Sequence, residues 1–356
     1  MWMHVIARTL PGPRTVPAGW SGRDCRTLFV RYERIGDMIM ATGIIRVLAQ
    51  AVAGGKVDVL ANPSTIPVLQ GNPHVGRVFT LDKSWKSYVT VGRKLRAVRY
   101  DAIVDGRINN PRVFTSTPLL MRAAGAPYRV GVGGGNNDLV YNVRVPAYDR
   151  VTPYIEASKA LAVPFGVDID AVDWRPEIFL SAGEVAAAEA EWEKAADTVE
   201  ARYAEGSARA KRLLVNLSAS EPKRRWADAR FVEVLGRVRA AVPGMPIVVI
   251  GLPREWPSVE RVAGSVGALP VATPRLRQAL AMVGTSDMVF TPDTSISHAA
   301  SAFSKPAVVL LKRDHHPYAP YDIPGEIIFW DGNEISSLPS NTVGDTVERL
   351  VRKYGH

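Results

Sequence analysis

The amino-acid sequence predicts an α/β protein with two doubly wound parallel-sheet domains that face each other across a cleft. Its 356 residues suffice for two domains at roughly 150 residues each. Short apolar, β-branched runs alternate with helix-length segments almost from end to end, which is typical of strands joined by right-handed crossovers. These runs are apolar throughout, as expected where helices cover both faces of a sheet.

The first half of the chain contains five apolar runs that predict strands. They lie at 27–32, 56–61, 77–81, 102–105 and 129–132. Helical patterns between them cover 37–52, 85–99 and 111–124. We therefore expect a first domain over 27–175, preceded by a flexible leader at 1–26 that is rich in Pro, Gly and Arg.

A second series of strands follows a break around 173–181, where Asp-Trp-Arg-Pro and a Ser-containing turn precede a long Ala/Glu-rich helix at 182–203. The predicted strands are 213–217, 246–251, 269–272, 288–291 and 307–311. The predicted helices between them include 227–241 and 275–284. We therefore expect a second domain over 176–356.

Charge and cysteine content limit the classes of partner and site. The chain has 44 Lys and Arg against 35 Asp and Glu, a net charge of +9, which favours an anionic partner such as nucleic acid, acidic lipid or a phosphorylated small molecule. The single cysteine, Cys25, excludes an intramolecular disulfide framework and a cysteine-based zinc site. No stretch approaches 18 uninterrupted apolar residues, so no transmembrane segment is expected. The broken apolar part of the leader also argues against a cleaved signal peptide.

Ligands of open parallel sheets bind beyond the carboxyl ends of the strands, and the first candidate segment follows the strand at 27–32. There Gly36 permits a tight turn and Asp37 stands where the next helix begins. Asp37 is either a helix N-cap or a general base directed at a substrate hydroxyl. The Gly-x-Gly-x-x-Gly spacing of dinucleotide-binding proteins is missing after this strand.

The second candidate segment, 217–226, follows the first strand of the second half. Ser218 and Ser220 precede three consecutive basic residues, of which Lys223 and Arg224 are the first two. Hydroxyl groups, loop amides and cations at the mouth of a sheet predict a diphosphate site. The alternative is a solvated basic loop.

The third candidate segment, 291–298, contains an Asp-Thr-Ser run that opens a helix and ends in His298. Free backbone amides and the positive end of a helix dipole attract phosphate. The alternative is an ordinary capped helix with a buried histidine.

One further group of polar residues is Asp314, His315 and His316. Two adjacent histidines without further suitably spaced ligands do not predict a metal site. We therefore expect no metal ion and no cofactor.

The three segments together resemble the heptosyltransferase family, glycosyltransferase family nine, over nearly the whole chain from about residue 27 onward. The matching motifs are Ile-Gly-Asp-Met-Ile-Met-Ala-Thr at 35–42, Tyr-Asp-Ala-Ile-Val-Asp at 100–105, Arg-Val-Gly at 129–131, Lys-Arg-Arg-Trp at 223–226, Pro-Asp-Thr-Ser-Ile-Ser-His at 292–298 and Lys-Pro-Ala-Val-Val-Leu-Leu at 305–311. The resemblance implies the GT-B architecture, in which an acceptor-side and a nucleotide-sugar-binding Rossmann-like domain face each other.

The resemblance also implies roles for individual residues. Asp37 matches the carboxylate that deprotonates the acceptor hydroxyl. The implied donor-binding residues are Ser218, Ser220, Lys223, Arg224, Glu255, Asp293, Thr294, Ser295 and His298. The family usually has lysine two residues before the tryptophan, where this chain has arginine, so either cation of the pair at 223–224 is a candidate for the phosphate contact.

Two departures from the family pattern concern the substrate. Glu33 and Arg34 replace the small serines that are common before Gly-Asp, and Ser295 stands where glycine is frequent. These departures indicate a divergent member whose donor need not be ADP-heptose.

The predicted activity is an inverting, metal-independent transfer of heptose or a related sugar from a nucleotide-diphosphate donor, ADP-linked by resemblance, to a lipopolysaccharide-type or other surface-glycan acceptor. The expected partners are the donor, a glycolipid or oligosaccharide acceptor and the anionic inner face of the plasma membrane, with a cytoplasmic location and no nucleic acid. The alternatives are a nucleotide-sugar epimerase of similar shape and a non-catalytic nucleotide- or RNA-binding protein. A nicotinamide-dependent oxidoreductase is disfavoured because the glycine fingerprint is missing.

Overall fold

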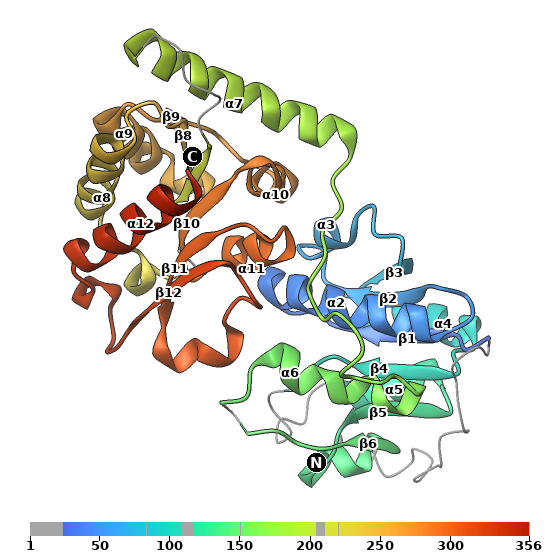
Figure 1. Ribbon diagram of the computed structural model, residues 1–356. Coiled ribbons are helices and arrows are strands. Elements are labelled where there is room, and N and C mark those ends of the chain that lie inside the picture. Colours follow the sequence, from blue (N-terminus) through green and yellow to red (C-terminus); the bar gives the residue numbers. More distant parts are fainter. Residues whose placement is uncertain are drawn as a thin grey trace. The chain divides into compact units, whose positions relative to one another are not determined.

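The computed structural model describes residues 24–82, 84–108, 117–149, 151–203, 211–219 and 221–355. The chain divides between Glu177 and Ile178 into two compact units, two residues beyond the boundary expected from the sequence. Each unit is built on one parallel sheet flanked by helices (Figure 1). Almost all of the predicted leader lies outside the described residues.

The first unit contains six parallel strands in the order β3-β2-β1-β4-β5-β6. The strands are β1 Thr27–Val30, β2 Val57–Ala61, β3 Val75–Thr80, β4 Ala102–Asp105, β5 Tyr128–Val132 and β6 Val143–Val145. The helices are α2 Ile35–Ala51, α3 Ile66–Leu69, α4 Trp85–Val98, α5 Thr117–Ala124 and α6 Tyr154–Ser158. Helix α2 packs against α3 and α6, while α4 packs against α5, as right-handed crossovers on two opposite faces require.

The second unit contains six parallel strands in the order β12-β11-β10-β7-β8-β9. The strands are β7 Leu213–Asn216, β8 Ile247–Ile250, β9 Leu269–Pro270, β10 Met288–Pro292, β11 Ala307–Lys312 and β12 Gly325–Trp330. The helices are α7 Ala182–Tyr203, α8 Asp228–Ala241, α9 Trp256–Val266, α10 Leu276–Thr285, α11 Ser295–Ala302 and α12 Ser340–Tyr354. Helices α8, α9 and α12 lie side by side, as do α7, α10 and α11.

Both units have the same strand order when each is counted from its own first strand, namely 3-2-1-4-5-6. The order reverses between β1 and β4 in the first unit and between β7 and β10 in the second. Ligands of doubly wound sheets bind at the carboxyl ends of the strands on either side of such a reversal. The fold therefore directs attention to the residues that follow these four strands.

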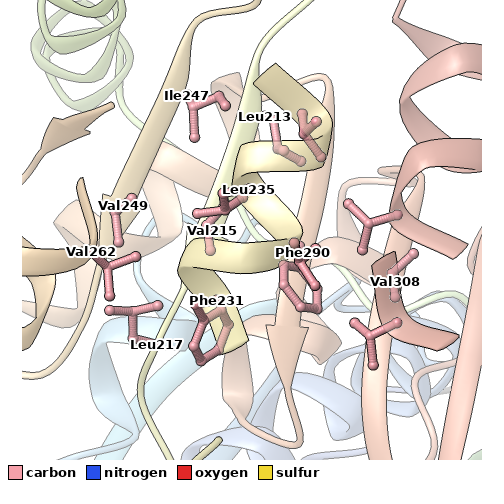
Figure 2. Close-up of a cluster of buried hydrophobic side chains, with 14 of the residues drawn as sticks. Leu213, Val215, Leu217, Phe231, Leu235, Ile247, Val249, Val262, Phe290 and Val308 are labelled. Carbon is pink, nitrogen blue, oxygen red and sulfur yellow. The ribbon is translucent and has the colours of Figure 1, made fainter. Parts of the chain in front are cut away.

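The core of the second unit explains the tryptophan of the Lys-Arg-Arg-Trp motif. Trp226 is fully buried, and its ring packs edge-on against Phe231 and Phe290, with ring centroids 5.1 and 6.1 Å apart. Figure 2 shows the two phenylalanines among the aliphatic side chains of β7, β8 and α8. Trp226 thus ties the basic loop that precedes it to the core of the sheet.

The long helix expected at 182–203 is α7, with the expected bounds. Its first turn is held by a capping box, in which the Ser181 amide donates to Glu184 Oε2 over 2.8 Å and the Glu184 amide donates to Ser181 Oγ over 3.3 Å. Arg277 of α10 also donates to the Glu184 carboxylate, and this hydrogen bond lowers the pKa of Glu184 to about 2. Helix α7 is therefore fastened to the second unit.

The sequence reasoning missed two of the four edge strands, β6 and β12, as well as helices α9 and α12. Strand β6 has only three residues, with an exposed arginine in its centre, and β12 begins with two exposed residues, so neither is a long buried apolar run. The strand predicted at 269–272 is limited to Leu269–Pro270. The helix predicted at 111–124 is described only over Thr117–Ala124, since 109–116 lie outside the described residues.

Candidate functional site

In the first unit, Asp37 lies in the first turn of α2, directly after the carboxyl end of β1. The N-cap of this helix is Arg34, so the interpretation of Asp37 as an N-cap is wrong. The side chain of Asp37 is 15% exposed, and its Oδ1 lies 3.3 Å from Nη2 of Arg31. Asp37 is thus a partly exposed carboxylate, a residue type that serves as a general base when it can reach a substrate hydroxyl.

Arg31 is the buried residue that organises this site. Its Nη1 donates to the carbonyl of Gly106 over 3.0 Å and lies 3.3 Å from Glu33 Oε2. Its guanidinium also stacks on the ring of Tyr154, 4.8 Å from the centroid. One nitrogen of the Arg31 guanidinium thus faces the carboxylate of Asp37, and the other faces that of Glu33.

A second ion pair follows the carboxyl end of β4, the neighbouring strand. Arg107 Nε and Nη2 contact the two oxygens of Asp105 at 3.0 and 2.7 Å, and the hydroxyl of Tyr141 donates to Asp105 Oδ2. A Cβ at Gly131 would lie 2.7 Å from the Tyr141 ring. The glycine of the Arg-Val-Gly motif therefore makes room for the tyrosine that holds Asp105.

Glu33 is the carboxylate for which the sequence reasoning gave no role beyond a departure from the family. It lies between Arg31 and Arg107, with its Oε1 3.8 Å from Arg107 Nε, and its Oε2 is buried without a hydrogen bond. Burial raises the pKa of Glu33, and the two arginines only partly oppose this effect.

The raised pKa of Glu33 has a consequence that can be measured. A carboxyl group whose pKa is higher in the folded state favours folding in its protonated form, and this contribution is lost as the pH rises through the folded-state pKa. We expect the free energy of unfolding of Glu33→Gln, relative to wild type, to increase as the pH rises from about 4, the pKa of an unperturbed glutamate, to the higher folded-state pKa. Urea unfolding at a series of pH values measures this difference. A difference that stays constant or decreases with pH would contradict the assignment.

In the second unit, Asn216 at the end of β7 joins two of the predicted segments. Its Nδ2 donates to Oγ1 of Thr291 over 2.9 Å and to Oγ1 of Thr294 over 3.1 Å. Its Oδ1 accepts hydrogen bonds from the amide and the hydroxyl of Ser218. The sequence reasoning missed Asn216, although a polar residue that ends the buried run Leu-Leu-Val was a usable signal.

The basic loop after β7 was expected to be either a diphosphate site or a solvated loop. Its two candidate cations differ in exposure. Lys223 is 55% exposed and pairs with Glu221 at 3.0 Å. Arg224 is only 12% exposed, with its Nη1 3.6 Å from Asp293 Oδ2 and its Nη2 3.1 Å from His315 Nε2. The structure therefore brings Arg224 to the turn after β10 and leaves Lys223 at the surface. Ser220 lies outside the described residues.

The turn after β10 leads into α11 as expected. Thr294 is the N-cap, and its Oγ1 accepts a hydrogen bond from the amide of Ile296. Ser295 is the first residue of the helix, while His298 lies buried within it, as in the alternative interpretation. Backbone amides at this helix start and the positive end of the helix dipole favour a bound anion.

Glu255 lies in the loop after β8. Its side chain is buried, and its Oε2 accepts a hydrogen bond from the amide of Leu252 over 3.0 Å. The neighbouring Arg254 donates to the carbonyl of Ala219. Glu255 thus shapes its own turn, and this turn contacts the loop that contains Ser218.

The arrangement in the second unit suits a diphosphate. One largely covered arginine, a helix start and a serine-containing loop follow strands that are neighbours in the sheet, and each type of group recognises phosphate oxygens. Among the described residues, no group of three or more His, Cys, Asp or Glu side chains has the arrangement of a metal site.

Comparisons with known proteins agree with this architecture. The crystal structure of the glycosyl transferase family 9 from Veillonella parvula DSM 2008 aligns with a TM-score of 0.76 at 16% identity, over 94% of this chain and 99% of that one. The Escherichia coli heptosyltransferase WaaC with ADP aligns with a TM-score of 0.71 at 18% identity, over 91% of this chain and 99% of that one. These likenesses confirm the predicted α/β fold with two Rossmann-like doubly wound domains of the GT-B class.

Sequence comparisons point the same way. Lipopolysaccharide heptosyltransferase 3 of Escherichia coli (strain K12) is 32% identical over 84 residues, and the match spans 21% of this chain and 24% of that protein. The family model described as Glycosyltransferase family 9 (heptosyltransferase) matches residues 88–323. This match covers well over half of the chain, and the chain therefore belongs to glycosyltransferase family 9, the heptosyltransferases.

Proposed function

We propose that this protein transfers a sugar from a nucleoside-diphosphate donor to a hydroxyl group of a lipopolysaccharide-type or other surface-glycan acceptor. The family match over 88–323 is the observation that carries the proposal. The name of the relative that acts on lipopolysaccharide and the ADP bound in the WaaC structure support the acceptor class and an ADP-linked donor.

On the acceptor side, Asp37 removes the proton of the attacking hydroxyl. Arg31 pairs with this carboxylate from a buried position, with Nη2 3.3 Å from Asp37 Oδ1, and so restrains its orientation toward the acceptor. A base of this kind accelerates attack on a sugar by about 10²–10⁴-fold.

On the donor side, the diphosphate leaves toward Arg224 and the start of α11. Negative charge develops on the leaving oxygen as the bond to the sugar breaks, and preorganised donors aimed at that oxygen lower the barrier. In this proposal Ser218, Asp293, Thr294 and Ser295 shape the diphosphate pocket around Arg224. Because a cation and a helix start already supply positive charge, we propose that transfer needs no metal ion.

The proposed stereochemistry rests on the role proposed for Asp37. One carboxylate that activates an acceptor hydroxyl is sufficient for a single displacement, in which the acceptor attacks as the diphosphate leaves from the opposite face. A single displacement inverts the configuration at the anomeric carbon. We therefore propose inversion, with no covalent sugar–enzyme intermediate.

We also propose that the protein binds its acceptor at an anionic membrane surface. The net charge of +9 favours contact with acidic lipid, and a glycolipid acceptor would reside there. Among the helices that the structure describes, none has the combination of length and hydropathy typical of a membrane span. The proposed contact is peripheral.

The proposed donor class can be tested by thermal unfolding in the presence of nucleotides. A ligand that binds only the folded state at a hundredfold excess over its Kd stabilises the protein by about 2.7 kcal/mol. We expect ADP to raise the unfolding temperature more than UDP or GDP at equal concentration. A larger shift with UDP or GDP would overturn the ADP assignment. Conversion of the sugar donor to its epimer without an acceptor would overturn the transferase assignment.

A further inference from the structure

His315 connects two residues of the donor site that lie far apart in the sequence. It belongs to the short 3-10 segment Arg313–Tyr318 after β11, whereas Asp293 follows β10 and Arg224 lies in the loop after β7. Strands β11, β10 and β7 are consecutive neighbours in the sheet. Their carboxyl ends therefore bring the three side chains to one place.

The two nitrogens of the His315 ring have different partners. Nδ1 lies 2.8 Å from Asp293 Oδ2, and Nε2 lies 3.1 Å from Nη2 of Arg224. These are hydrogen-bonding distances, so the imidazole lies between a carboxylate and a guanidinium. Nη1 of Arg224 lies 3.6 Å from the same oxygen of Asp293.

The chemistry of the partners determines where the proton of the neutral ring resides. A guanidinium has only N–H donors, so the nitrogen that faces Arg224 has to accept with its lone pair. An ionised carboxylate has only acceptors, so the nitrogen that faces Asp293 has to carry the hydrogen. Both requirements are met by one tautomer, with hydrogen on Nδ1 and a bare Nε2. A doubly protonated ring would direct an N–H group at the arginine.

We propose that His315 is a positioning residue of the donor site, which transmits the orientation of Asp293 to Arg224 and thereby aims the guanidinium at the diphosphate of the nucleotide. The link from imidazole to diphosphate rests on the proposed function, whereas the hydrogen-bonded chain from Asp293 through His315 to Arg224 does not. His315 acts through Arg224 and need not touch the nucleotide.

The hydrogen-bonded chain from Asp293 through His315 to Arg224 can be tested without any ligand. Long-range ¹⁵N–¹H correlation spectra of the full-length protein distinguish the two neutral tautomers of histidine, and His315→Gln identifies the signal among the six histidines. We expect the Nδ1–H tautomer near neutral pH and a change in its population in Arg224→Met. A predominant Nε2–H tautomer, or a signal that Arg224→Met leaves unaltered, would overturn the proposal.

The positioning role is tested by the affinities for ADP and AMP measured by calorimetry. We expect His315→Ala to weaken ADP about tenfold and AMP less, because the second phosphate is the group at which Arg224 is aimed. In a double-mutant cycle, His315→Ala should cost little further affinity once Arg224 is already alanine. Equal losses for ADP and AMP, or additive losses in the cycle, would show a merely structural histidine.

The adjacent histidine provides a matched control. His316 packs on the ring of Phe329, with ring centroids 5.8 Å apart. It is not one of the residues of the hydrogen-bonded chain from Asp293 to Arg224. His316→Ala should therefore leave the affinity for ADP as in wild type. If wild-type protein does not bind ADP, the proposed donor is wrong, and the tautomer experiment still decides whether His315 bridges the two residues.

Discussion

Asp37→Asn should lower the rate of sugar transfer by about 10²–10⁴-fold, the contribution typical of a general base. The amide has nearly the size of the carboxylate but cannot accept the proton of the acceptor hydroxyl. The proposed donor residues belong to the second unit, so we expect the affinity for the nucleotide to stay close to that of wild type. Single-turnover kinetics with saturating donor measure the first effect, and calorimetry with ADP measures the second.

A second aspartate of the same unit serves as the control for this variant. Asp82 stands before α4, where its carboxylate accepts a hydrogen bond from the amide of Ser84. Asp82→Asn removes the same charge without touching Arg31, and transfer should continue at the wild-type rate. If Asp37→Asn also transfers at the wild-type rate, Asp37 serves only to balance the charge of Arg31.

Arg224→Ala should weaken binding of ADP by about 10–100-fold, because a hydrogen bond to a charged group contributes about 1.5–3 kcal/mol. Lys223→Ala should cost much less, because Lys223 is largely exposed and pairs with Glu221. An exposed pair contributes about 0–1 kcal/mol. The comparison of the two variants by calorimetry identifies the cation that contacts phosphate.

The third cation of the same run provides the control. Arg225 donates to Asp228 at the start of α8 over 2.6 Å. Arg225→Ala removes one positive charge from the loop and should reduce affinity for ADP no more than Lys223→Ala does. Equal losses for all three variants would indicate that the net charge of the loop attracts the nucleotide.

The central part of the fold could be predicted from the sequence because buried parallel strands are continuous apolar runs. The positions of Asp37, Arg224 and Thr294 followed from the same reasoning, since each comes shortly after such a run. The edge strand β6 could not be predicted in this way. It contains three residues, of which the central Arg144 is exposed, and so has no continuous apolar run.

The contacts that organise the site could not be predicted, because they join residues far apart in the chain. Arg224 and His315 are separated by 91 positions, and a hydrogen bond of this kind leaves no local pattern. Asn216 is different, since it ends a buried strand as its only polar residue. A search for polar residues at the last position of apolar strands would have found it.

The repeated strand order has a consequence for how substrate preference can diverge. Each half of the chain has its own sheet, and each places its polar loops at its own reversal point. Under the proposed division of roles, substitutions around Glu33 would change acceptor choice and leave the core of the second unit beneath Arg224 as it is. Substitutions around Arg224 would in turn change donor choice and leave the core of the first unit as it is. Exchanging one half of the chain with the corresponding half of a relative is therefore a reasonable way to obtain new pairings of sugar and acceptor.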